Sequence, residues 1–102
     1  MTMEHDELTL RLNAETATIA WSELQRYFAQ GRTLYVAPEL DLVAVAKAIV
    51  EDNSAYMEPL VAQEAVRAVL DEEAQQWLAQ DASVWAVVVP PYVLVQPATT
   101  QH

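Results

Sequence analysis

The fold of this 102-residue chain is decided by Val84-Trp85-Ala86-Val87-Val88-Val89-Pro90-Pro91-Tyr92-Val93-Leu94-Val95-Gln96. The stretch is almost wholly apolar and rich in β-branched and aromatic residues, which suit a packed, pleated surface. We expect it to form the main strand segment of a sheet on which the preceding helices pack. Fully extended, it would span roughly 43 Å, whereas a compact domain of this size has a diameter of roughly 33 Å. The stretch must therefore bend or pair with another chain.

Two prolines in the middle of this stretch limit how it can run. Proline donates no hydrogen bond to a ladder and holds the residue before it extended. Two interpretations remain: one long strand kinked at Pro90-Pro91, or a reversal through a type VI turn with a cis bond before Pro91. Because only about 5–6% of X–Pro bonds in folded proteins are cis, the sequence favours the kink.

The composition predicts one acidic domain and excludes several kinds of chemistry. There are no cysteines, which excludes disulfides and thiolate sites. We find no signal-peptide pattern and no apolar run of membrane-spanning length, so we expect a cytoplasmic protein. The net charge of −10 disfavours nucleic acid and anionic membranes as partners. We expect a single globular domain over residues 1–97 and a polar tail over 98–102.

Five helical patterns and two short strand patterns precede the apolar stretch, and from them we expect about four helices packed on a small mixed sheet, hence an α+β domain. Leu8, Leu10 and Leu12 fit either a helix or a strand, and we prefer a helix. Helical patterns cover residues 6–17, 22–30, 41–52, 54–64 and 71–81, and strand patterns cover 33–37 and 66–69. The expected N-caps are Ser22, Asp41, Ser54 and Asp71, with Gly31 as the C′ residue of the second helix.

Few residues are candidates for chemistry. His5 and His102 lie at the two ends of the chain and have no partner at metal-ligand spacing. Glu51 and Asp52 end a predicted helix, where its dipole prefers cations, and they are weak candidates for a metal site or for acid–base catalysis. Glu39 with Asp41 is a second carboxylate pair. Adjacent acids are common at helix ends, so we expect no catalytic residues, no metal and no cofactor.

An aromatic pocket is the alternative site. Trp21, Tyr35 and Trp85 are weak candidates to line a small-molecule pocket. A more ordinary role for Trp85, which is flanked by apolar residues, is in the core.

The chain resembles a family of small bacterial proteins, number 2288 in the domain-of-unknown-function series. The resemblance covers nearly the whole chain and is most specific near the C-terminus. Its motifs are Glu15-Thr16-Ala17, Trp21-Ser22-Glu23-Leu24, Phe28-Ala29-Gln30-Gly31, Pro38-Glu39-Leu40-Asp41-Leu42-Val43, Gln76-Trp77, Trp85-Ala86-Val87-Val88-Val89 and Val93-Leu94-Val95-Gln96. Tyr92 stands where the family pattern leads us to expect tryptophan. The resemblance implies no activity and transfers no site residues.

These observations favour a non-enzymatic protein that acts through protein contacts, with a small-molecule-binding domain as the alternative and a carboxylate-based metal enzyme third. An apolar strand kinked by prolines is expected at a sheet edge, and such edges are covered by a helix, a loop or a partner. We therefore predict a homodimer whose interface includes Tyr92, Val93, Leu94 and Val95.

Overall fold

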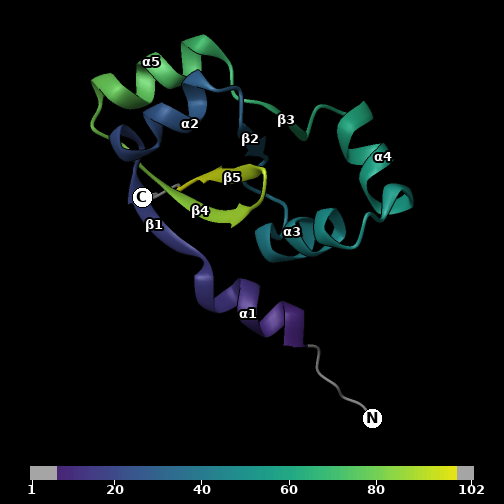
Figure 1. Cartoon of the computed structure of the whole chain (residues 1–102). Coiled ribbons are helices and arrows are strands. Elements are labelled where there is room, and N and C mark those ends of the chain that lie inside the picture. Colours follow the sequence, from purple (N-terminus) through teal and green to yellow (C-terminus); the bar gives the residue numbers. More distant parts are fainter. Residues whose placement is uncertain (1–6, 99–102) are drawn as a thin grey trace.

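The computed structural model describes residues 7–98 as an α+β domain (Figure 1). The prediction of an α+β fold with a mixed sheet is confirmed, with five α-helices in these residues where about four were expected. In chain order the elements are α1 (Glu7–Glu15), β1 (Ala17–Ala20), the 3-10 helix η1 (Trp21–Leu24), α2 (Gln25–Ala29), β2 (Thr33–Val36), α3 (Leu42–Val50), α4 (Ser54–Ala62), β3 (Val66–Ala68), α5 (Asp71–Ala79), β4 (Ser83–Val89) and β5 (Tyr92–Pro97). Most of the expected tail, and both histidines, lie outside the described residues.

The apolar C-terminal stretch forms a hairpin, so the predicted kinked strand is wrong. The bond between Pro90 and Pro91 is cis, and β4 and β5 pair antiparallel from Val89 opposite Tyr92 onward. The reversal lets each half of the stretch satisfy the backbone hydrogen bonds of the other. It also divides the long apolar segment into two strands of ordinary length.

The five strands lie in the order β1-β4-β5-β2-β3. The pair β2–β5 is parallel and the other three pairs are antiparallel. The C-terminal strand β5 is therefore in the middle of the sheet, and β1 and β3 form its two edges. The expectation that this strand lies at an edge is wrong, because it pairs on both sides.

Helices cover both faces of the sheet, and each face has its own apolar cluster. On the first, here called the α3 face, α1 and α3 bury Leu12 and Val45 against strand residues that include Val87 and Leu94. On the second, the α5 face, η1 and α5 bury Trp21 and other residues against the strands. That cluster consists of Trp21, Leu24, Val69, Ala74, Val84, Val93 and Val95. Each fully buried side chain of valine or leucine size contributes roughly 1.5–3 kcal/mol, so the sheet is held from both sides.

The edge strand β1 was missed by the sequence analysis, which placed a helix to about residue 17. The helix ends at Glu15, where the Thr16 hydroxyl donates a hydrogen bond to the Leu12 carbonyl. The β-branched residues Thr18 and Ile19 then run extended beside β4. Four residues are too few to show a clear periodicity, and their stability comes from pairing with β4, far along the chain.

Helix caps agree with the sequence at two of the expected positions. The Asp41 carboxylate accepts hydrogen bonds from the Val43 and Ala44 amides, which confirms it as the cap of α3. Gly31 has a φ of +72°, as its role at the end of α2 requires. The expected caps Ser22, Ser54 and Asp71 are wrong.

Three other arrangements replace those caps. A 3-10 helix without a side-chain cap begins at Trp21. The Asn53 side chain caps α4 by accepting from the Tyr56 amide. At α5 the Glu73 carboxylate accepts from the Leu70 amide, three residues before it. In two of these cases the capping side chain is one or two residues from the predicted position, which is the ordinary uncertainty of a helix boundary.

Candidate functional site

The three aromatic residues predicted to share a pocket do not come together. Trp21 is fully buried on the α5 face, where its ring meets Phe28 and Trp77 edge to face at 5.7 and 5.0 Å. Tyr35 lies on the same face. Trp85 points to the opposite face. It pairs with Gln96, whereas Tyr35 pairs with Val95. Adjacent residues of a strand project to opposite sides of the sheet, so Trp85 and Tyr35 do as well. Trp85 is 42% exposed, so its expected core role is also wrong.

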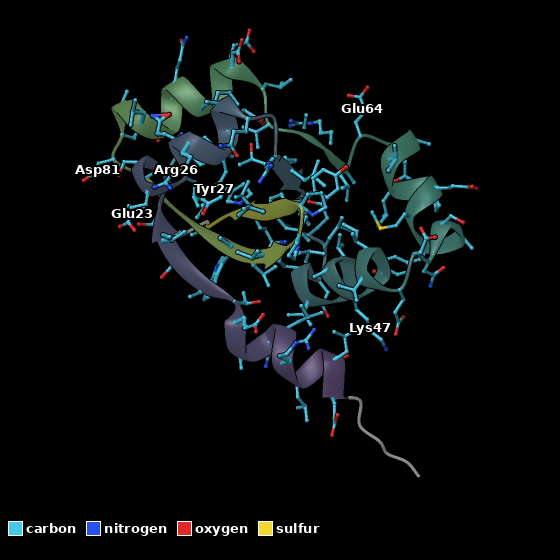
Figure 2. The ribbon with its side chains drawn as sticks, in the orientation of Figure 1. Glu23, Arg26, Tyr27, Lys47, Glu64 and Asp81 are labelled. Carbon is cyan, nitrogen blue, oxygen red and sulfur yellow. The ribbon has the colours of Figure 1, made fainter. Side chains whose placement is uncertain are left out.

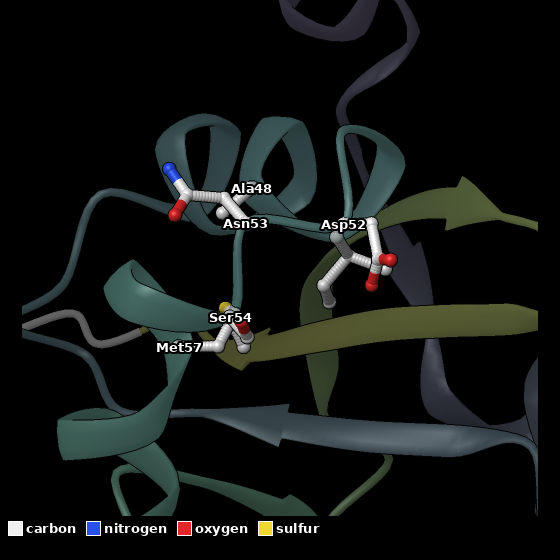
Figure 3. Close-up of a pocket in the computed structure, with 6 residues that line it drawn as sticks. Ala48, Asp52, Asn53, Ser54 and Met57 are labelled. Carbon is white, nitrogen blue, oxygen red and sulfur yellow. The ribbon is translucent and has the colours of Figure 1, made fainter.

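The predicted acidic corner forms the connection between α3 and α4. Asp52 takes a left-handed φ of 56°, and Asn53 turns the chain into the next helix (Figure 3). A hollow of about 200 Å³ between Ala48, Asp52 and Met57 adjoins another of about 220 Å³ next to Glu51. Both are open to solvent. Among residues 7–98, no three histidine, aspartate or glutamate side chains lie close enough to hold a metal ion.

A charged cluster at the β3 edge was not predicted from the sequence. Arg67 on β3 makes two hydrogen bonds of 2.9 and 2.8 Å to the carboxylate of Glu73 on α5. Its guanidinium lies 4.0 Å from the centre of the Tyr35 ring, in cation–π geometry. The arginine Nη1 also donates to the Ala68 carbonyl. The sequence does contain a signal for this cluster: an arginine lies six residues before a glutamate in the first turn of a helix.

The pKa values in this cluster shift in the directions that the pairing dictates. Hydrogen bonds from Arg67 hold the pKa of the Glu73 carboxyl below its ordinary value of 4.5. The same bonds raise the pKa of Arg67. Partial burial raises the pKa of the Tyr35 phenol above 10.0, against the opposing effect of the arginine charge. All three residues are therefore held in their ordinary charge states at neutral pH, which indicates a structural role.

The opposite edge of the sheet is open. In the antiparallel pair of β1 with β4, the Trp21 amide donates to the Ala82 carbonyl at 2.9 Å. Backbone groups in such a pair alternate in direction, so Ile19 and Ala17 also bond to β4. Thr18 and Ala20 must then direct their N–H and C=O groups away from the sheet. An edge of this kind is a template for pairing with another strand.

An apolar hollow of about 160 Å³ lies beside this edge on the α5 face. We call its apolar floor and rim the β1–β4 surface, which consists of Ala17, Ile19, Ala86, Val88 and Val93. Val88 is 56% exposed, because η1 and α5 cover the other end of this face. Glu15 is the acidic residue in the lining. Open backbone groups and uncovered apolar side chains thus meet in one place.

The predicted interface residues lie mostly inside the subunit. Val93, Leu94 and Val95 have exposed fractions of 3%, 0% and 0%, and Tyr92 is 37% exposed at the hairpin turn. Three of the four are enclosed by the sheet and its helices, because β5 is a central strand. The open edge is instead β1.

One comparison with known proteins shows the family, and another shows a similar fold. The profile of the family described as "Protein of unknown function (DUF2288)" matches residues 7–97. The solution NMR structure of PA1075 from Pseudomonas aeruginosa is similar over 100% of this chain and 97% of that one, with 37% identity and a TM-score of 0.79. Among curated proteins, no significant match is found.

Proposed function

Because the chain belongs to the DUF2288 family, whose function is unknown, we propose a function from its own surfaces: it is a non-enzymatic protein that acts through protein contacts and self-associates. The observation that carries this proposal is the coincidence of the open β1 edge with the apolar β1–β4 surface. Soluble proteins protect long apolar edges, and an edge left open beside exposed aliphatic side chains is suited to a partner.

The hollows support protein contacts over a small-molecule site. Those at the α3–α4 connection and beside β1 have volumes of about 160 to 220 Å³. Pockets for drug-sized ligands have volumes of roughly 300–1,000 Å³ and enclose most of the ligand. The paired charges of Arg67 and Glu73 are occupied with each other and with the α5 terminus, so they do not support a catalytic site.

Charge and composition complete the proposal. Described residues from Ala37 onward carry ten acidic and two basic side chains, which disfavours nucleic acid and anionic lipid as partners. The chain has no cysteine and so does not depend on an oxidising compartment for disulfides, and we propose a cytoplasmic location. Between residues 7 and 98, none of the helices has the length and apolarity required to cross a membrane.

The test of self-association is the mass of the purified protein in solution. Light scattering on a sizing column at micromolar concentration should give twice the chain mass of 11.4 kDa. The mass should fall toward that of one chain on serial dilution, because a small edge interface dissociates. A mass of 11.4 kDa that stays constant up to the highest soluble concentration would contradict the proposal.

A further inference from the structure

We infer that two copies pair antiparallel through their β1 strands about a twofold axis perpendicular to the sheet, and so join two five-stranded sheets into one. This inference rests on the proposed self-association and specifies its geometry. It uses the same residues on both copies, as a twofold interface requires. Four observations support it: the direction of the backbone groups, the positions of the flanking helices, the distribution of charge and the location of the apolar surface.

The backbone of β1 offers the hydrogen bonds that such pairing needs. Thr18 and Ala20 direct their N–H groups outward, because the alternate residues of β1 are bonded to β4. In an antiparallel pair each of these amides meets a carbonyl of the other copy. The free edge of one strand is thereby satisfied by an identical strand running in the opposite direction.

The helices at the two ends of β1 leave room for a second copy. α1 precedes β1 and packs on the α3 face through Leu12, whereas η1 follows β1 and packs on the α5 face through Trp21. A twofold axis perpendicular to the sheet keeps each face on its own side and reverses the strand direction. At each end of the pair, α1 of one copy and η1 of the other therefore lie over opposite faces. Figure 1 shows α1 and η1 at the two ends of β1.

Charge favours this edge over the rest of the surface. From α1 through β2, the chain carries three glutamates and three arginines and is neutral. Residues 37–98 carry ten acidic and two basic side chains, so their net charge is −8. Two copies repel each other wherever their acidic parts face. The approach of least repulsion brings together the neutral parts, and β1 lies within them.

The charges beside β1 are mixed in sign under this symmetry. Glu15 lies just before the strand and lines the hollow on the α5 face. Glu23 and Arg26 lie just after it, near its far end (Figure 2). Antiparallel pairing brings the exposed Glu15 of one copy to the end where the other copy presents both Glu23 and Arg26, so one repulsive and one attractive pairing occur at each end. Exposed ion pairs contribute at most about 1 kcal/mol each, so the affinity comes from the backbone and apolar contacts.

The apolar surfaces of the two copies become neighbours in this arrangement. Ile19 projects to the α5 face close to the twofold axis, opposite Val84 of its own subunit. Because the axis preserves the faces, both β1–β4 surfaces lie on the same side of the joined sheet. They meet at the two Ile19 side chains, and this contact stabilises the pair by removing isoleucine surface from water.

The decisive variant is Ala20→Pro. Ala20 has φ −64° and ψ 133°, which proline adopts without strain. Its N–H points away from β4, so the substitution leaves the internal ladder intact while removing an outward donor and adding a ring at the edge. We expect normal circular dichroism and a dissociation constant raised by at least about tenfold, since two hydrogen bonds are lost across the axis. The matched control Ala20→Ser keeps the N–H and should dimerise as wild type does.

Hydrogen exchange gives a second readout that needs no variant. The Thr18 and Ala20 amides should exchange at least about tenfold more slowly at concentrations where the dimer forms than in the diluted monomer. A folded Ala20→Pro protein that dimerises like wild type would overturn pairing through β1. So would rapid exchange of both amides in a wild-type dimer. Either result leaves self-association standing, whereas a wild-type protein that stays monomeric overturns the proposed function itself.

Discussion

The two edges of the sheet are built differently, although each consists of one short strand. At β3 the outward carbonyl of Ala68 accepts a hydrogen bond from Arg67, whose guanidinium is fixed by Glu73 and lies over Tyr35. We call this arrangement of Arg67, Glu73 and the Ala68 carbonyl the clamp. At β1 the outward groups of Thr18 and Ala20 have apolar neighbours and no such clamp among the described residues. Proteins blunt an edge strand with charge or short length when it must stay unpaired. The comparison indicates that β3 is closed to partners and β1 is open.

The largest effect is expected when the clamp at β3 is removed. Arg67→Ala leaves the partly buried Glu73 carboxylate without its partner and frees the Ala68 carbonyl. We expect the free energy of unfolding to fall by roughly 2–3 kcal/mol, because a charge-assisted bidentate pair and a cation–π contact are lost. Urea denaturation followed by tryptophan fluorescence measures the change. Arg32→Ala, which removes an exposed arginine near β2, is the control and should change stability by less than about 0.5 kcal/mol.

A smaller effect should appear when the free energy of unfolding is measured as a function of pH, on the acid side. The folded protein lowers the pKa of Glu73, so this carboxylate contributes stability that is full above its ordinary pKa of 4.5. That contribution is lost as the pH falls through the lowered pKa. Glu73→Gln should therefore cost roughly 1–2 kcal/mol at neutral pH and progressively less in acid. If the difference between the two proteins does not shrink in acid, the clamp is not electrostatic. The exposed Glu72→Gln is the matched control.

The smallest effect on stability is expected at the open edge. Val88→Lys places a charge on the exposed β1–β4 surface and should cost less than about 1 kcal/mol of folding free energy. Val61→Lys is a matched control, because Val61 is 55% exposed on α4 and Val88 is 56% exposed on β4. Light scattering should show weaker association for Val88→Lys and no change for Val61→Lys. If the two variants associate equally strongly, the β1 edge is not the site of association and the two edges do not differ in function.

The sequence predicts the elements that carry their own local signals. Asp41 before an apolar helical stripe gives the start of α3, and Gly31 gives the end of α2. The apolar stretch is correctly predicted as the main strand segment of the sheet. These features follow from capping chemistry, backbone freedom and periodicity, all of which act within a few residues.

The remaining features depend on partners that are distant in the sequence. Most X–Pro bonds in folded proteins are trans, yet the bond before Pro91 is cis, at the turn across which β4 and β5 pair. The exposure of Trp85 depends on how far α1 and α3 extend over the sheet. The charged cluster joins Tyr35 on β2 to Arg67 on β3, and the register of those strands brings them face to face. Local patterns contain no information on strand order, so the open edge was assigned to the wrong strand.

The central position of β5 has a consequence for how the protein is made. Ribosomes deliver the chain from its N-terminus, and β5 is the last element of the sheet to appear. Until residues 92–97 are synthesised, β1 with β4 and β2 with β3 are two separate pairs of strands, with no strand between them to complete the sheet. Isolated two-stranded pairs are at best marginally stable in water. The domain therefore completes its fold only after nearly all of it has been translated, and a nascent chain shorter than this exposes both apolar clusters.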